Sequence, residues 1–380
     1  MNKAEALAKG IQIEPTRHSM KRRSPWHNYH RKGTYMLTLV VAGRMPLLGH
    51  LQGRADAPPG SPDAPRIILS PLGSAILNDE VQKISRYYPM VEVWRLCIMP
   101  DHIHIIVRVK EDMPSGKHLG QVVRGFKTGC SRAWWRLSAP SPLPSGEPSG
   151  TVAAPVPSAS PEGIPAPVPA PVPSVSPEGF PAPVPAPVPS AFPEGLPRPV
   201  LFEPGYNDKI LLHEGQLDNW KAYLDDNPRR LLIKRQNPRL FTILHDMPIA
   251  GRNCQIIGNR FLLDIPDKMA VIVHRRYSDE ENARLRQEWL ACGERGGVLV
   301  SAAISPKEKA VLREAMNRGY RIILLRDNGF PPLYKPSGEA FDACSAGLLL
   351  QVSPWPYHME QTTITRSQCL ALNALAEEIV

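Results

Sequence analysis

The sequence predicts a two-part protein: an N-terminal α+β domain and a C-terminal α/β domain, with a proline-rich low-complexity insertion. In the N-terminal half, strand-like runs and segments with helical spacing of apolar residues indicate an antiparallel sheet with helices on one face. The C-terminal part alternates short apolar strands with helices, which is typical of a layered domain with a mostly parallel sheet. About half of the 43 prolines lie within residues 139–200, so the proline excess is local.

A chain of 380 residues is long enough for two or three domains. The predicted divisions are a basic N-terminal arm (1–33), a first domain (34–138 together with 201–245), the insertion (139–200) and an accessory domain (246–380).

The elements of the first domain follow from local patterns. Residues 34–41 are rich in β-branched and aromatic side chains, which predicts a buried strand. Residues 70–88 have helical spacing of apolar side chains, and Pro71 suits a first helical turn. The remaining predicted elements are a loop at 51–66, strands at 91–96 and 103–109, and helices at 119–137 and 215–226, the last ending at Asn227-Pro228.

The elements of the accessory domain alternate in type. Strands are predicted at 269–274, 297–301, 320–325 and 347–352, and helices at 279–292 and 305–318.

The insertion contains an internal repeat. Ser160-Pro-Glu-Gly recurs with Ser176 and again with Phe192 in the first position. Alternate prolines remove backbone donors and favour polyproline II, so this segment is predicted to be a semi-rigid spacer without a core. The alternative is a proline-rich docking ligand, although most of its PxxP units have no basic residue beside them.

Charge and cysteine usage narrow the class of protein. The net charge of +9 indicates a polyanionic partner, nucleic acid before membrane. No apolar run approaches the length of a membrane span, and no secretion signal is expected. The six cysteines form neither a CxxC motif nor a close Cys/His cluster, which favours a reducing compartment. We therefore expect a cytoplasmic, nucleoid-associated protein.

Two histidines form the sharpest local feature, His102-Ile103-His104. On a strand, residues i and i+2 project from the same face, so both imidazoles can reach one metal ion. The spacing alone does not distinguish this from two partly exposed strand histidines.

Tyr223 and Asn227 form the second feature, one turn apart on the predicted helix. A phenol can attack an electrophile while a neighbouring amide oxygen binds a hard cation such as Mg²⁺ or Mn²⁺. Taken separately, Tyr223 fits a packed helix tyrosine and Asn227 fits an ordinary helix end before proline.

Taken in order, these residues and their flanks resemble the single-tyrosine HUH transposases, most closely the REP-associated tyrosine transposases. The resemblance covers residues 25–138 and 201–240. The matching segments are Tyr35-Met-Leu-Thr-Leu, Gly43-Arg44, Leu47-Leu48-Gly49, Met99-Pro-Asp-His-Ile-His-Ile-Ile-Val107, Gly125-Phe126-Lys127, Gly205-Tyr206-Asn207-Asp208-Lys209-Ile210 and Tyr223-Leu-Asp-Asp-Asn-Pro228. Two departures are Asp101, where the family more often has Asn, and the proline-rich insertion.

The resemblance implies a fold, an activity and a site. The fold would be the ferredoxin-like HUH nuclease fold. His102, His104 and Asn227 would hold Mg²⁺ or Mn²⁺, and Tyr223 would be the nucleophile that cleaves and rejoins single-stranded DNA through a 5′-phosphotyrosine. The partner would be single-stranded DNA with REP-like hairpins, bound by a monomer or a homodimer, for transposition or domesticated repeat processing.

Several basic residues are candidate phosphate contacts: Arg44, Arg124, Lys127, Arg229 and Arg230. A catalytically idle DNA-hairpin-binding regulator is the alternative function. A metallohydrolase with a water nucleophile is a third, weakened because no carboxylates cluster near the histidine pair.

The accessory domain faintly resembles the Rossmann-like domain of DNA-processing protein A over residues 250–355. The matching segments are Gly296-Gly-Val-Leu-Val-Ser301, Gly319-Tyr-Arg-Ile-Ile-Leu-Leu325 and Gly329-Phe-Pro-Pro-Leu-Tyr334. Ala302-Ala303-Ile304 stands where a glycine- and arginine-rich loop is expected. The domain is therefore expected to be a non-catalytic accessory, with independent phosphate binding as the alternative.

Overall fold

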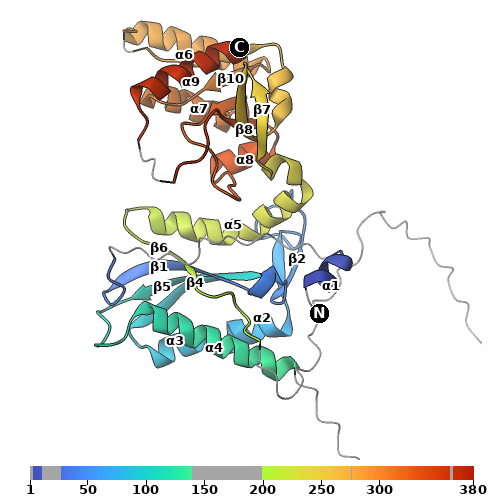
Figure 1. The fold of residues 1–380 in the computed structure, drawn as a ribbon, viewed down its shortest axis with the longest axis vertical. Coiled ribbons are helices and arrows are strands. Elements are labelled where there is room, and N and C mark those ends of the chain that lie inside the picture. The colour runs from blue at the N-terminus through green and yellow to red at the C-terminus, as the bar shows by residue number, and fades with distance from the viewer. Residues whose placement is uncertain (1–2, 11–26, 139–198, 275, 360–362) are drawn as a thin grey trace, which may run out of the picture.

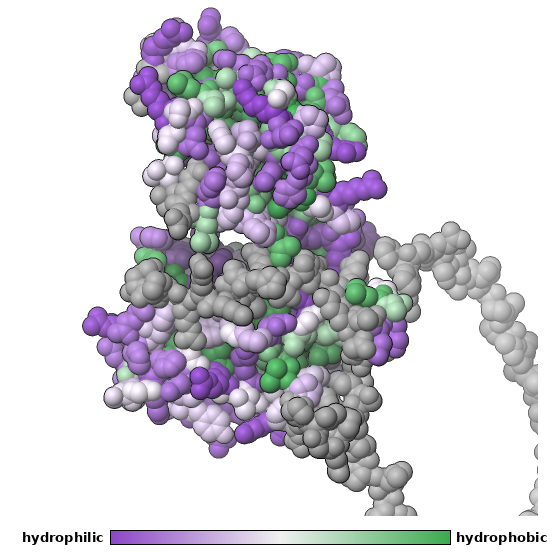
Figure 2. Space-filling view, in the orientation of Figure 1, coloured by the Kyte–Doolittle hydropathy of each residue, from purple (hydrophilic) through white to green (hydrophobic). Residues whose placement is uncertain are grey.

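A computed structural model describes residues 3–10, 27–138, 199–274, 276–359 and 363–380. Most of the predicted basic arm, and residues 139–198 of the predicted spacer (139–200), lie outside these ranges. Two sheets occupy opposite ends of the long axis, and helix α5 (Gln216–Gln236) lies between them (Figure 1). On the face seen in Figure 2, hydrophilic and hydrophobic side chains are interspersed at both ends.

The first sheet has four antiparallel strands in the order β4-β5-β1-β6. Its strands are β1 (Gly33–Val40), β4 (Val91–Met99), β5 (His102–Val109) and β6 (Asn207–Ile210). Strand β6 was not predicted from the sequence, because its four residues are polar except for Ile210. A separate hairpin of β2 (Gly49–Gln52) and β3 (Arg66–Leu69) encloses most of the predicted loop.

Helices cover both faces of this sheet, whereas the sequence predicted helices on one face. The first face carries α2 (Pro71–Ala75), a π-helical turn (Ile76–Glu80), α3 (Gln82–Tyr87) and α4 (Leu119–Ser138), packed on the main core. The other face carries α5, whose Trp220 and Leu224 pack on Met36 and Ile106. The central strands bury apolar side chains on both sides, so both faces need a cover.

Helix α5 is longer than predicted. The sequence predicts an end at Asn227-Pro228, but the helix continues to Gln236 with Pro228 inside it. A proline inside a helix costs about 3 kcal/mol because one backbone hydrogen bond is lost and the ring clashes. Beyond Pro228, however, Leu231 and Ile233 are buried, and Ile233 joins the core of the second sheet. This packing explains why the helix continues.

The second sheet has six strands in the order β7-β8-β12-β11-β10-β9. Its strands are β7 (Leu244–Ile249), β8 (Arg252–Gly258), β9 (Lys268–Ala270), β10 (Val298–Ser301), β11 (Arg321–Leu325) and β12 (Leu349–Ser353). The last four are mutually parallel, as the sequence predicts, and β7 and β8 are added antiparallel. The antiparallel pair was missed because its strands alternate weakly and contain Pro248.

The parallel strands follow one another in order across the sheet, so right-handed crossovers place their helices on one face. These helices are α6 (Asp279–Glu294), α7 (Pro306–Asn317) and α8 (Glu339–Ser345), and they share a core with the sheet. The opposite face is covered by α9 (Arg366–Ile379) and a 3₁₀ turn (Arg260–Asp264). Alternate residues of each strand therefore enter different cores; Leu299 enters one, and Val298 and Val300 enter the other.

The remaining short elements are α1 (Lys3–Ala8) and 3₁₀ turns at Ala42–Arg44 and Pro238–Phe241.

Candidate active site

The histidine pair lies on the face of the first sheet that α5 covers. His102 and His104 both line a cavity, and their ring centroids are 4.8 Å apart at an interplanar angle of 84°. The two side chains share this face because residues i and i+2 of a strand project to the same side. Their role as metal ligands stays a prediction.

Each imidazole is held through its Nδ1 atom. The Nδ1 of His102 lies 2.6 Å from Asp101 Oδ1, and the Nδ1 of His104 lies 2.9 Å from Thr38 Oγ1. Asp101 also accepts a hydrogen bond from Arg44 Nη1 at 3.1 Å. When Nδ1–H donates to these oxygens, Nε2 keeps its lone pair, which is the arrangement found around metal-binding histidines.

Burial and the neighbouring charges favour a neutral His104 imidazole and an ionised Asp101 carboxylate. Burial lowers the pKa of His104 well below its usual value, and the nearby His102, Lys209 and Arg44 lower it further. For Asp101, burial acts to raise the pKa, but His102 and Arg44 outweigh burial and bring it to about 2. His104 is therefore present as a neutral donor.

Helix α5 brings Tyr223 to this pair. The Tyr223 ring lies edge-on to the His104 ring, with centroids 5.6 Å apart at 71°. Trp220 and Leu224 anchor the helix to the sheet, which leaves the Tyr223 side chain at the cavity wall and 37% exposed. Helical and strand periodicities thus combine to place a phenol beside two imidazoles.

Asn227 lies one turn further along α5 and lines the same cavity. Its side chain is 5% exposed, and its Nδ2 is buried without a hydrogen-bond partner. Buried amide groups normally have hydrogen-bond partners, so this atom marks a position where a bound polar ligand would supply the missing partner. A half-turn of the amide brings Oδ1, a metal-binding acceptor, to the same position at no steric cost.

These residues fit a divalent metal through two imidazoles and one amide rather than through acidic side chains. Among the described residues, no group of three or more His, Cys, Asp or Glu side chains is arranged to hold a metal ion. The fit therefore rests on the two held imidazoles and on the unsatisfied amide of Asn227.

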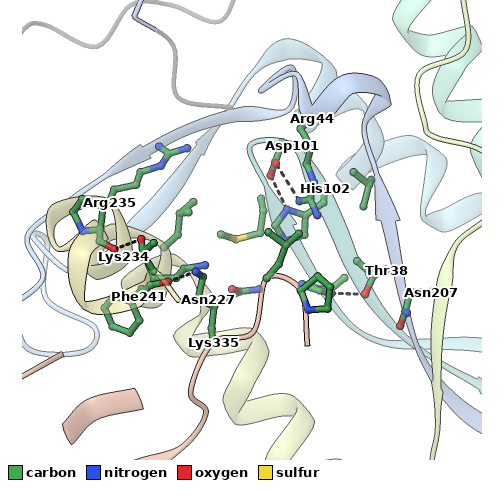
Figure 3. Close-up of a pocket in the computed structure, with 18 of the residues that line it drawn as sticks. Thr38, Arg44, Asp101, His102, Asn207, Asn227, Lys234, Arg235, Phe241 and Lys335 are labelled. Carbon is green, nitrogen blue, oxygen red and sulfur yellow. Dashed lines mark hydrogen bonds and ion pairs between the residues drawn. The ribbon is translucent and has the colours of Figure 1, made fainter. Parts of the chain in front are cut away.

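The cavity has a volume of about 1150 Å³ and is lined from both halves of the molecule. Figure 3 shows Arg44, Asp101 and His102 on one side and Arg235, Phe241 and Lys335 on another. Among the residues that the structure describes, the cavity is lined by five lysine or arginine side chains: Arg44, Lys209, Lys234, Arg235 and Lys335. Such a lining attracts anions.

The candidate phosphate contacts lie in varied places. Arg44 pairs with Asp101, and Arg124 is exposed on α4. Lys127 Nζ donates to the backbone oxygens of Glu203 (2.5 Å) and Gly205 (2.9 Å), and burial lowers its pKa.

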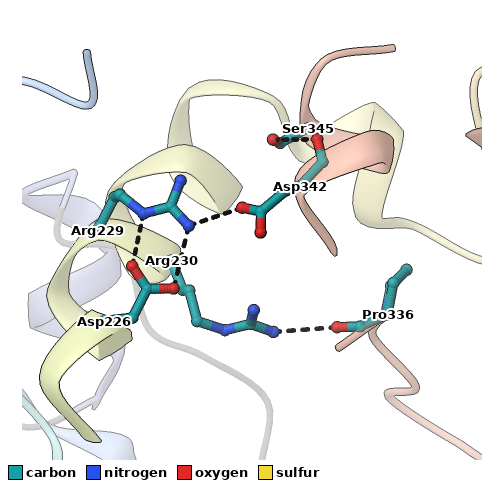
Figure 4. Close-up of polar contacts among 6 residues, drawn as sticks. All are labelled: Asp226, Arg229, Arg230, Pro336, Asp342 and Ser345. Carbon is teal, nitrogen blue, oxygen red and sulfur yellow. Dashed lines mark hydrogen bonds and ion pairs between the residues drawn. The ribbon is translucent and has the colours of Figure 1, made fainter. Parts of the chain in front are cut away.

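Arg229 and Arg230 both contact the C-terminal half (Figure 4). Arg229 pairs with Asp226 and, at 2.7 Å, with Asp342 of α8. Arg230 donates to the Pro336 oxygen at 3.0 Å and lies 3.7 Å above the Phe341 ring and 5.8 Å from the Tyr223 ring. Phosphate binding by these two residues and by Arg44, Arg124 and Lys127 stays a prediction.

Sequence reasoning missed Thr38 and Lys209 as site residues. Thr38 faces His104 directly across the β1–β5 ladder, and Lys209 lies on the edge strand β6. The register of the strands brings both to the pair, and one sequence without a known register gives no signal for it.

The segment after Ser301, where the sequence lacks a glycine- and arginine-rich loop, has its backbone donors bound by a side chain of the protein itself. The buried Glu308 carboxylate accepts from the backbone N–H of Val273 (2.8 Å), Ile304 (2.7 Å) and Ser305 (3.1 Å). The backbone donors at the N-terminus of α7, which could otherwise bind an anion, are therefore bound by the helix's own Glu308.

Comparisons with solved structures include the following two likenesses. One solved structure is a REP-associated tyrosine transposase bound to a REP hairpin, with 13% identity, 55% of this chain and 73% of that chain covered, and a TM-score of 0.26. Another is DNA processing protein A from Helicobacter pylori, in a study of its single-stranded DNA binding, with 19% identity, 36% and 65% covered, and a TM-score of 0.27. At these scores neither likeness establishes a shared fold. No family model and no curated protein matches the chain.

No helix within the described ranges is both long and apolar enough to cross a membrane. The domain boundaries and the oligomeric state stay predictions.

Proposed function

We propose that this chain cleaves and rejoins single-stranded DNA through Tyr223, with Mg²⁺ or Mn²⁺ held by His102, His104 and Asn227. The observation that carries the proposal is the Tyr223 ring 5.6 Å from the His104 ring, at the wall of a cavity lined with cationic side chains.

The chemistry is a transesterification. The Tyr223 oxygen forms a bond to phosphorus, the bond from phosphorus to the 3′ oxygen breaks, the phenol loses its proton to solvent, and the 3′ oxygen takes one up. The product is a 5′-phosphotyrosine with a free 3′-hydroxyl, which reverses the reaction when it attacks. A bound divalent metal would neutralise charge on the phosphodiester.

The chain's own residues contribute position and charge. Thr38 and Asp101 orient the imidazoles, and α5 holds Tyr223 and Asn227 on one face. Arg230 supplies a positive charge near the Tyr223 ring. Imidazole and amide ligands carry no negative charge, which suits a phosphate substrate.

The proposal includes finer statements about fold and biology. The antiparallel sheet with the histidines on its central strand β5 supports a ferredoxin-like HUH nuclease fold for the first half. The parallel strands β9 to β12 support a Rossmann-like accessory for the second. The DNA would carry REP-like hairpins, processed in transposition or by a domesticated enzyme in the cytoplasm.

The test uses labelled single-stranded hairpin DNA with Mn²⁺ and looks for a covalent protein–DNA adduct. We expect an adduct with the natural chain and none with Tyr223→Phe, which deletes only the attacking oxygen, while hairpin binding stays nearly unchanged. The matched control is Tyr206→Phe, a buried tyrosine that lines a different pocket with Lys127. An adduct that persists in Tyr223→Phe but disappears in Tyr206→Phe contradicts the assignment.

The metal assignment is tested with His102→Ala and His104→Ala. Each should abolish cleavage, because the remaining ligands bind a hard cation weakly. His50→Ala on the separate hairpin is the control and should stay active. Hairpin binding by the natural chain without any adduct would favour the idle regulator instead.

A further inference from the structure

The cavity beside Tyr223 has one wall from the C-terminal half. Besides the histidine strand and α5, its lining includes Phe330, Pro332 and Lys335, which follow strand β11 of the second sheet. The Nζ of Lys335 donates to the backbone oxygen of Phe241, so the loop is fixed to the 3₁₀ turn after α5. The two halves therefore enclose one space.

The lining of this space has a strong excess of positive charge. Among the described lining residues, five side chains are lysine or arginine, and Asp101 is the one acid. Asp101 is already bound by Arg44 and His102. An anionic ligand is the chemistry that this lining selects.

The dimensions favour an extended ligand over a small one. A volume of about 1150 Å³ exceeds the roughly 300–1,000 Å³ of typical small-molecule pockets. Lys234 is eleven residues beyond Tyr223 on the same helix, about 16 Å along the axis at 1.5 Å per residue. That length has room for several consecutive phosphates.

We infer that the C-terminal half forms the second wall of a cleft for single-stranded DNA, in which Lys234, Arg235 and Lys335 bind phosphates of the segment leading away from Tyr223. The inference depends on the proposed function only for the choice of DNA as the ligand. It gives the accessory half a binding role at the cleavage site, separate from the helix N-terminus that Glu308 occupies.

The experiment measures binding without cleavage. A fluorescent single strand is titrated with protein in the Tyr223→Phe background, without metal, over a series of salt concentrations. Each phosphate contact on a single strand contributes about 0.7 to the slope of log K against log salt. Lys234→Gln and Lys335→Gln should each lower the slope by about 0.7.

Two controls keep the result interpretable. Lys309→Gln, an exposed lysine of α7 outside the cavity lining, should leave the slope unchanged. Lys335→Arg keeps the positive charge and should restore the slope lost in Lys335→Gln.

The inference is overturned if Lys234→Gln and Lys335→Gln bind with the slope of the Lys309→Gln control while their circular dichroism is native. It is also overturned if a duplex of the same sequence binds equally tightly with the same changes. A failure of the proposed function looks different, because the chain would then bind the strand along this cleft but form no adduct with Mn²⁺.

Discussion

Thr38→Val tests whether the hydrogen bond between Thr38 and His104 tunes the candidate site. The Thr38 hydroxyl lies 2.9 Å from Nδ1 of His104, whose side chain is 7% exposed. Valine has nearly the same shape and suits a strand, so the change removes the hydrogen bond and little else. The stranded Nδ1–H should cost about 1–3 kcal/mol of stability. Loss of such an orienting partner typically lowers metal affinity or activity about 10–100-fold.

The assay is the Mn²⁺ concentration that gives half-maximal adduct, together with thermal unfolding. Thr34→Val is the matched control: it lies on the same strand, and its hydroxyl accepts from Arg108 at 3.0 Å rather than from the site. It should lower stability without moving the metal dependence, and Thr38→Ser should keep both. If Thr38→Val and Thr34→Val show the same metal dependence, the orienting role assigned to Thr38 is wrong.

Two further predictions concern the insertion and the C-terminal half. Trp135 Nε1 donates to the Pro199 oxygen at 2.9 Å, so the end of α4 meets the chain after the insertion. A short Gly/Ser loop in place of residues 139–198 should keep adduct formation and raise the free energy of unfolding by at most about 2 kcal/mol. If the shortened protein instead loses activity, or elutes at a different volume in size-exclusion chromatography, the spacer lets Tyr223 reach the histidines of a second copy. Glu308→Ala should lower the free energy of unfolding by about 3 kcal/mol, because three backbone donors lose their acceptor. Urea unfolding measures this change, and a loss below about 0.5 kcal/mol would contradict the capping role of Glu308.

The sequence predicted those features that depend on local periodicity. The shared face of His102 and His104 follows from strand alternation, and the parallel strands of the second sheet follow from their spacing between helices. The one-turn separation of Tyr223 and Asn227 likewise needs only the helical repeat.

Features that depend on tertiary packing were not predictable. Local rules predict a helix end at Pro228, but the helix continues because Leu231 is buried and Ile233 packs in the core of the second sheet. Thr38 meets His104 only through the register of two strands far apart in sequence. The sequence suggests Arg229 and Arg230 as phosphate contacts because they are basic, yet in the structure each contacts a residue of the C-terminal half.

Because α5 belongs to both cores, the chain cannot be shortened at the apparent boundary without harm. Its first turns are buried on the first sheet through Trp220 and Leu224, and its last turns on the second through Ile233. A fragment ending near residue 245 would expose the last turns, which then lack the packing that holds a helix together past a proline. Tyr223 would sit on a fraying helix, so an inactive fragment would report lost rigidity rather than a missing catalytic group.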